Sequence, residues 1–508
     1  MKPSKELFHL VKSLSKSEKR FFKLTSSLQS GDKNYLKIFD VIDKQDDYDE
    51  EAIKDMFKGE VFIKHFPSEK NHLYKLILKS LRSYHSDNSI SSILKQEIKN
   101  IEILYQKALY KECNKFLNRA KKLAIEHEKF YYLFELLNWE KILLEEAYEE
   151  GEFTKDLDVL IREEKEVIER LRNLAAYHIL YSKINYVFRS GGYVRNEQGL
   201  RVVEEISSHP LIVGKNTALS KRAATICYYI QGFCALARLD RKTCITKFNR
   251  VKEIFDENPK IRKDLPKRYV RTLSNLILCK IDLKKYDEAK ALLDELKRII
   301  ETRGFQSTDI KVMAFKSTSL AEMKMYSRLG EFDKAIVQIQ PIIAELDSYS
   351  EKINKEQEIL FYYHIAYIFF GYGEFNKALF WINKVLNDNE SSLRQDIYSY
   401  ARIFNLIIHY ELGNHDLLEY IIKSTSRYLN KRNRAYEVET LIMSGVKKLA
   451  KAYDEGQRQK IYTQVKKDLK TVLKDHQQKI VLEYFDFNSW LDSKINEVSL
   501  SEELKKAS

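Results

Sequence analysis

The chain has 508 residues, of which only 15 are Gly and 6 are Pro, and it carries a formal net charge of +13. A β-rich protein needs Gly and Pro at its many turns, so this composition excludes one, and the abundant helix formers predict an all-α fold. No stretch of about 18 apolar residues occurs, so we expect no membrane-spanning helix.

The cysteines and the first residues bear on the cellular compartment. There are five Cys, an odd number without a C-x-x-C pair, which predicts neither a disulfide framework nor a zinc site. We interpret them as small core residues. Residues 1–20 carry charges throughout and have no apolar run of signal-peptide length. We therefore expect a cytoplasmic protein.

Residues 1–88 are predicted to form an N-terminal helical cap domain. A first helix begins near Ser15 or Ser17, either of which can cap it, with Glu18 in the first turn. Two further short helices follow, and a long helix begins at Ser68, directly after a proline.

The long helix carries a polar, basic stripe at spacings of four, four and three residues. Its members are Asn71, Lys75, Lys79 and Arg82. The arrangement is loosely similar to a helix-turn-helix, in which this stripe would face the major groove of DNA. The other interpretation is the solvated face of a domain that caps a repeat array.

A pattern of glycine, aromatic, small and apolar residues recurs further along the chain. The three clearest copies are Gly373, Phe375, Ala378, Ile382 and Val385; Gly330, Phe332, Ala335, Ile339 and Ile342; and Lys284, Tyr286, Ala289, Leu293 and Leu296. In the third copy, Lys284 takes the place of the glycine. Another apolar helix is predicted upstream of each copy. The recurrence indicates repeated helix pairs in residues 89–430.

The small residue of each copy serves as a marker of the repeat. Extending the spacing in both directions gives the markers Cys113, Asp156, Leu200, Cys244, Ala289, Ala335, Ala378 and Leu418. Successive markers lie 40 to 46 residues apart. Asp156, Leu200 and Leu418 are placed by this spacing rather than by residue type.

These residues resemble the tetratricopeptide repeat (TPR), with units lengthened from the usual 34 or so residues to about 44. The resemblance implies a right-handed α-solenoid of about eight stacked antiparallel helix pairs. It also implies that the first helix of each pair lines a concave surface, where such proteins bind peptides or proteins. The family's standard clamp for a terminal carboxylate is not reproduced, since only Asn275 falls on a matching position.

The two glycines Gly371 and Gly373 suggest a phosphate-binding loop at first sight. Asn376 occupies the place of the third glycine of G-x-G-x-x-G, and a helix rather than a strand is predicted before them. We therefore interpret the pair as an elbow between two helices.

The family geometry predicts which side chains line the partner groove. They are Tyr229, Phe233, Arg271, Asn275, Lys324, Arg328, Tyr363 and Tyr367. Tyr and Arg are typical of binding hot spots, and Asn can bond a peptide backbone. The alternative is that the same side chains pack along elongated helices.

Residues 431–508 are predicted to form a basic helical cap and tail. Between Lys423 and Lys479 there are 15 Lys and Arg against 6 Asp and Glu. The candidate basic patch consists of Lys447, Lys451, Lys467, Lys470 and Lys474. It is interpreted either as a solvated face or as a surface that attracts an acidic partner or a nucleic-acid backbone. The residues after Trp490 are predicted to be a frayed helix and tail.

No motif for catalysis, metal binding or a cofactor occurs: H-E-x-x-H, the phosphate-binding loop of nucleotide hydrolases and G-x-S-x-G are all absent. The first hypothesis is a non-enzymatic scaffold or adaptor that binds a protein or peptide. The second is a transcriptional regulator whose N-terminal helices bind DNA and whose repeats sense a peptide, similar to bacterial peptide-sensing repeat regulators.

Overall fold

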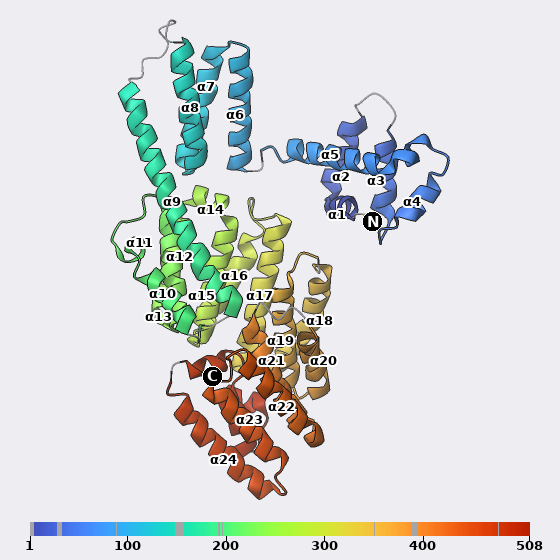
Figure 1. Ribbon diagram of the computed structural model, residues 1–508, viewed down its shortest axis with the longest axis vertical. Coiled ribbons are helices and arrows are strands. Elements are labelled where there is room, and N and C mark those ends of the chain that lie inside the picture. The colour runs from blue at the N-terminus through green and yellow to red at the C-terminus, as the bar shows by residue number, and fades with distance from the viewer. Residues whose placement is uncertain are drawn as a thin grey trace. The chain divides into compact units, whose positions relative to one another are not determined.

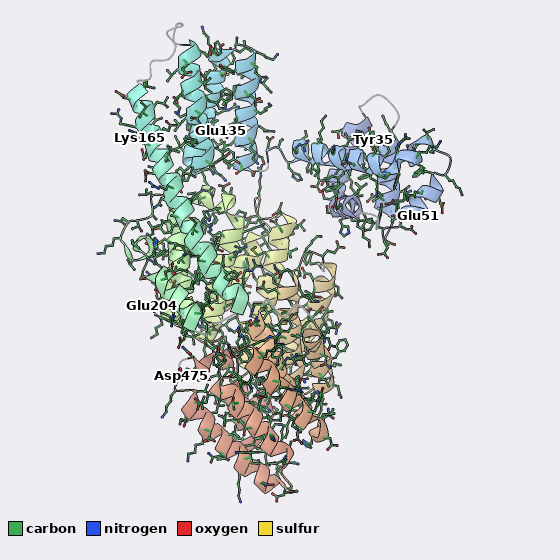
Figure 2. All side chains as sticks on the ribbon, viewed as in Figure 1. Tyr35, Glu51, Glu135, Lys165, Glu204 and Asp475 are labelled. Carbon is green, nitrogen blue, oxygen red and sulfur yellow. The ribbon has the colours of Figure 1, made fainter. Side chains whose placement is uncertain are left out.

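The structure, a computed structural model of residues 1–508, describes all of them except 1–4, 28–32, 88, 148–156, 192, 193, 196, 350, 389–393, 476 and 508. Every regular element in the part described is a helix, which confirms the all-α expectation. The chain divides into two compact units, Met1–Glu164 and Lys165–Ser508. The division lies within the long helix α9 (Leu157–Gly191), where Figure 2 labels Lys165.

The first unit begins with short helices that share one core. They are α1 (Glu6–Ser13), α2 (Lys16–Ser27), α3 (Asn34–Lys44), α4 (Glu50–Met56), the 3-10 helix η1 (Val61–His65) and α5 (Phe66–Tyr84). Helix α5 contacts α1, α2 and α3, and it buries Phe66, Leu73 and Ile77 in the common core. Ser15 caps α2 as predicted. Its hydroxyl accepts from the N–H of Glu18, and the Glu18 carboxylate accepts from the N–H of Ser15 at 2.7 Å.

Three further helices of the first unit pack in chain order. They are α6 (Ile90–Gln106), α7 (Tyr110–Glu126) and α8 (Phe130–Ala147). The first marker, Cys113, is buried on α7, and its thiol donates to the carbonyl of Ile101 on α6 at 3.2 Å. A small side chain therefore lies where these two helices meet, as the repeat pattern predicts.

The second unit continues α9 and contains most of the helix pairs, which follow one another from green to red in Figure 1. Its helices are α10 (Glu197–Ser207), α11 (Pro210–Val213), α12 (Lys221–Ala237), α13 (Arg241–Glu257), α14 (Pro259–Asp264), α15 (Pro266–Asp282), α16 (Tyr286–Ile299), α17 (Thr308–Leu329), α18 (Phe332–Ser348), α19 (Lys355–Gly371), α20 (Phe375–Leu386), α21 (Gln395–Glu411), α22 (His415–Lys431), α23 (Glu437–Ala450), α24 (Glu455–Val472), the 3-10 helix η3 (Gln478–Glu483), α25 (Phe487–Ile495) and α26 (Leu500–Ala507).

Neighbouring pairs contact one another in a regular order. From α15 onward each first helix contacts the next first helix, in the series α15, α17, α19, α21 and α23. Each second helix in turn contacts the first helix of the following pair, as α16 does with α17 and α18 with α19. The packing is therefore sequential, neighbour to neighbour.

The predicted register agrees with the helix boundaries. Helices α7, α10, α13, α16, α18, α20 and α22 each begin three residues before a predicted marker. The buried markers are Cys113, Cys244, Ala289, Ala335, Ala378 and Leu418. Leu200 is half-buried on α10, and Asp156 lies outside the described residues. The spacing of small residues thus fixed where the second helices start.

The same left-handed backbone conformation recurs between the two helices of these pairs. The residue five positions before the marker is left-handed in six of them: Ala108, Leu239, Lys284, Gly330, Gly373 and Gly413. In each, the N–H of the next residue donates to the carbonyl five positions earlier at 2.9–3.0 Å. This bond satisfies a carbonyl at the end of the first helix, as in the Schellman motif. The elbow interpretation of Gly371 and Gly373 is confirmed, because Gly371 is the last residue of α19, and Gly373 lies between α19 and α20 with a left-handed backbone.

The regular pairing does not extend through α9. This helix is 35 residues long and runs without a break through the interval between the markers Asp156 and Leu200. Residues 157–190 contain neither Gly nor Pro, so nothing in the local sequence ends the helix there.

The expectation of a frayed tail after Trp490 is wrong. Residues up to Ala507 form α25 and α26, and α26 contacts α17. Leu500 and Leu504 lie four residues apart on one face of α26 and are both buried. The Ser501 hydroxyl donates to the carbonyl of Gly330 at 2.7 Å. An amphipathic turn with two leucines therefore keeps this end of the chain packed.

Candidate partner-binding face

The eight predicted groove residues lie on four consecutive first helices of the second unit. Tyr229 and Phe233 belong to α12, Arg271 and Asn275 to α15, Lys324 and Arg328 to α17, and Tyr363 and Tyr367 to α19. We call the side of these helices that carries them the first-helix face. It divides into two parts, one toward α12 and one toward the end of the chain.

The part toward α12 is held by packing and by neutral hydrogen bonds. Tyr229 is only 4% exposed, and its hydroxyl accepts from the Asn275 amide at 2.8 Å. Its ring contacts those of Phe233 and Tyr181 at centroid distances of 5.0 and 5.7 Å. Arg271 is exposed and donates to the Tyr181 hydroxyl at 3.2 Å. Of these residues, Arg271 is the exposed one, while Tyr181, Phe233 and Asn275 are half-buried.

The other part is covered by the chain itself. Residues 482–487, which we call the C-terminal segment, lie across α17 and α19. Arg328 donates to the carbonyl of Leu482 at 2.9 Å, and the Tyr363 hydroxyl donates to the carbonyl of Tyr484 at 3.3 Å. Two of the predicted groove residues therefore bind main-chain carbonyls, as they would in a complex with a peptide.

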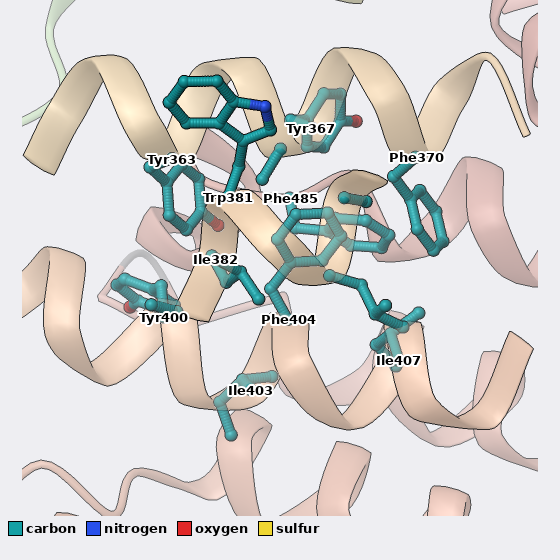
Figure 3. Close-up of a cluster of buried hydrophobic side chains, with 14 of the residues drawn as sticks. Tyr363, Tyr367, Phe370, Trp381, Ile382, Tyr400, Ile403, Phe404, Ile407 and Phe485 are labelled. Carbon is teal, nitrogen blue, oxygen red and sulfur yellow. The ribbon is translucent and has the colours of Figure 1, made fainter. Parts of the chain in front are cut away.

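The aromatic side chain of the segment fills a socket between two first helices. Phe485 is 2% exposed, and its ring lies 5.4 Å from that of Tyr367 and 5.2 Å from that of Phe404. Phe370 completes the socket at 5.6 Å (Figure 3). Tyr367 thus contacts Phe485 rather than solvent. Burying such a ring contributes about 2–3 kcal/mol, which makes Phe485 the main apolar anchor of the segment.

A buried network of charges holds the segment beside this socket. The Glu483 carboxylate accepts from Arg241 at 2.9 Å and from Lys324 at 3.1 Å. Asp282, at the end of α15, binds the same two cations at 3.1 and 2.6 Å. Burial alone would raise the pKa of Glu483, but Lys324, Arg328 and Arg241 hold it well below its usual range. The carboxylate is therefore charged at neutral pH and bound by three cations from α13 and α17.

His364 lines a small cavity beside this network, with a volume of about 30 Å³. Burial and the nearby cations Lys324, Arg394 and Arg328 lower its pKa to about 3. The imidazole is therefore neutral under physiological conditions, which avoids a further positive charge on this face.

Tyr484 anchors the segment on its other side. Its ring stacks on that of Tyr400 at 3.9 Å, and its hydroxyl donates to Asp396 at 2.5 Å. Asp396 is in turn bound by two nitrogens of Arg394. Arg195 donates to the Tyr400 hydroxyl at 2.5 Å. The sequence pattern did not indicate these residues, since none lies at a repeat position of the groove.

The two basic surfaces predicted from the sequence are exposed. Lys447 of α23 and Lys451, which directly follows that helix, lie near Glu419 of α22: the pKa of Glu419 is lowered first by Lys423 and then by Lys451 and Lys447. The remaining members of the patch are also exposed: Lys467 and Lys470 on α24, and Lys474 two residues after it. On α5, the whole stripe of Asn71, Lys75, Lys79 and Arg82 is exposed.

Within the part of the chain that the structure describes, no group of three or more His, Cys, Asp or Glu side chains is arranged to hold a metal ion. No helix there has the length and apolarity needed to cross a bilayer. Comparison of the sequence with models of known families and with curated proteins gives no match.

Proposed function

We propose that the chain is a non-enzymatic scaffold or adaptor that binds a protein or peptide on the first-helix face of a TPR-like α-solenoid. The repeated elbows, the buried markers and the sequential packing support the solenoid. The lengthened units extend the first helices and so enlarge the face. The scaffold acts in the cytoplasm, where its buried thiols remain reduced.

A single observation carries this proposal: the face already binds a peptide-like segment of its own chain. Arg328 and Tyr363 bind main-chain carbonyls of residues 482–487, and Phe485 enters a socket of aromatic rings. Main-chain bonds for affinity and a pocket for one side chain are what peptide recognition uses. The C-terminal segment shows the chemistry by which this face holds a segment of chain through its main-chain carbonyls and one aromatic side chain.

Site-specific photo-crosslinking in the cells from which the chain comes tests the proposal. A photoreactive amino acid in place of Arg271 is expected to give covalent adducts with a partner protein. Matched controls are Thr246 and Ala291, which are exposed at equivalent positions of α13 and α16. Adducts from position 271 that the controls do not give support the scaffold, whereas adducts from the controls alone would place the partner elsewhere.

The regulator remains a second candidate because of the exposed stripe on α5. Lys75, Lys79 and Arg82 have no carboxylate within ion-pair distance among the described residues. Three cations of this kind on one helix face are available to phosphate groups. A DNA-retention experiment distinguishes this candidate from the scaffold and is given below.

A further inference from the structure

Three cations gather on the part of the first-helix face that the C-terminal segment leaves uncovered. Arg268 and Arg271 lie on α15, one turn apart, and Lys316 lies on the neighbouring helix α17. Arg271 is exposed, while Arg268 and Lys316 are half-buried. We call these three side chains the cation cluster.

Only neutral groups bind the cluster directly. Arg268 donates to the Thr225 hydroxyl at 3.2 Å, Arg271 donates to the Tyr181 hydroxyl at 3.2 Å, and Lys316 donates to the Gln357 amide oxygen. Among the described residues, no carboxylate lies within 4.0 Å of any of the three cations. The acidic residue that acts on Lys316 from further away is Glu356, which pairs with Arg189 at 3.5 Å.

Holding the cluster together costs free energy. Burial lowers the pKa of Arg268, and the neighbouring Arg271 lowers it further. Burial and Arg271 likewise lower the pKa of Lys316. Like charges that repel one another on a partly dehydrated face destabilise the folded chain. The arrangement is therefore typical of a site that binds an anionic ligand.

A second set of three cations, near the same helix α17, shows how an acidic side chain binds such a site. Lys324 and Arg328 lie on α17, two to three turns beyond Lys316, and together with Arg241 they surround the carboxylate of Glu483. The lysines at 316 and 324 are separated by about 12 Å along the helix axis. Three cations, Lys324 and Arg328 of α17 with Arg241 of α13, therefore hold an acidic residue, whereas no described acidic residue pairs with the cation cluster a few turns away.

We propose that the cation cluster binds an acidic segment of a partner protein, in which aromatic residues accompany Glu or Asp as they do in Glu483–Phe487. This inference rests on the scaffold function proposed above and specifies the chemistry of the partner. The carboxylates bind Arg268, Arg271 and Lys316, and the aromatic residues contact the part of the half-buried Tyr181 that stays exposed. The partner extends along the face toward the socket that Phe485 occupies.

The surroundings of the cluster favour an acidic protein segment over a nucleic acid. Single-stranded nucleic acid binds where aromatic rings offer free faces for stacking of bases. The ring of Tyr229 is buried, and Tyr181 and Phe233 are engaged with it at 5.7 and 5.0 Å.

The test uses the full chain and a fluorescein-labelled peptide of alternating Glu and Tyr, with binding followed by fluorescence anisotropy at low ionic strength. The double variant Arg271→Glu with Lys316→Glu is expected to weaken binding about tenfold or more, since close charge pairs each contribute on that scale. Lys423→Glu, an exposed lysine of α22, is the control and leaves the affinity unchanged. If the reversed charges disturb folding, the double variant Arg271→Gln with Lys316→Gln replaces the first one. It is also expected to bind the peptide more weakly than the wild type and the control, with a smaller loss of affinity.

An unchanged affinity in both double variants, or no binding of the peptide by the wild-type chain, overturns the inference. So does a labelled oligonucleotide that binds through the same two residues more tightly than the peptide. If the peptide fails while photo-crosslinks from position 271 still capture a protein, the scaffold stands and only the acidic chemistry of its partner is wrong.

Discussion

Arg241 donates a hydrogen bond to Glu483 at 2.9 Å, although 242 residues separate the two in the sequence. Arg241 begins the second helix α13, and Glu483 ends η3. Closing so long a loop costs conformational entropy, which the contacts of Tyr484 and Phe485 beside it help to offset. The C-terminal segment is therefore an integral part of the second unit, and the first-helix face is partly occupied by the chain's own residues.

Glu483→Gln is expected to lower the free energy of unfolding by about 3 kcal/mol, because Arg328 loses its carboxylate and Asp282 is left to balance both Arg241 and Lys324. Urea unfolding followed by circular dichroism measures the loss. The control is Glu455→Gln, since Glu455 is exposed and, within the described residues, forms an ion pair with Arg458 one turn away and with no other cation. That change is expected to cost less than about 0.5 kcal/mol. Equal effects of the two substitutions would show that the network does not hold the segment.

Gly373→Ala and Gly371→Ala probe the elbow between α19 and α20. Gly373 has a φ of +90° and open space around it, so alanine there costs about 1 kcal/mol through backbone strain alone. Gly371 lies against the Phe332 ring, which an added Cβ would overlap, so its substitution costs about 1–3 kcal/mol through overpacking.

At the equivalent elbow between α15 and α16, the non-glycine residue Lys284 can be replaced by glycine. Lys284 is left-handed with a φ of +57°, and Lys284→Gly is expected to leave stability unchanged or raise it by up to about 1 kcal/mol. Thermal unfolding of all three variants gives the comparison. Destabilisation by Lys284→Gly together with no effect of Gly373→Ala would contradict the shared elbow.

His364 is expected to make stability depend on pH. Its pKa of about 3 in the folded chain lies below the value of about 6.5 for an unfolded chain. The unfolded state therefore binds more protons between these values, and stability falls as the pH drops below about 6.5. The loss between about pH 7 and pH 5 is expected to be smaller in His364→Gln than in the wild type. His65→Gln, an exposed histidine, should behave like the wild type, and an identical loss in all three proteins would exclude His364 as the cause.

The stripe on α5 provides the test of the regulator. Gel-shift experiments with genomic fragments compare the wild type with Lys75→Glu combined with Lys79→Glu. The scaffold account predicts no sequence-specific shift for either protein, even at low salt. A specific shift that the double variant abolishes would instead favour the regulator, because reversed charges repel the phosphates that unmodified lysines attract.

The repeat register could be predicted because small residues constrain helix packing locally. Ala289 and Ala378 recur with the spacing of the helices on which they lie, so sequence alone placed the starts of α16 and α20. The elbow at Gly373 was predictable for a similar reason, since glycine adopts a left-handed backbone conformation without strain.

The covering of the first-helix face could not be predicted in this way. Lys324 and Tyr367 were expected in the groove from their helical positions, but their contacts with Glu483 and Phe485 join segments more than 100 residues apart. No periodic pattern connects such residues. The one local signal was the run of acidic and aromatic residues Glu483–Phe487, which follows the basic stretch Lys423–Lys479 by three apolar residues.

A photoreactive phenylalanine analogue at position 485 of the full chain tests the central claim most directly, namely that the first-helix face binds an acidic and aromatic segment. Irradiation, digestion and mass spectrometry identify the residues that the analogue reaches. The account predicts crosslinks to α19 and α21, in the peptides that contain Tyr367, Phe370 and Phe404. Crosslinks confined to other helices, or none within the chain, would contradict it.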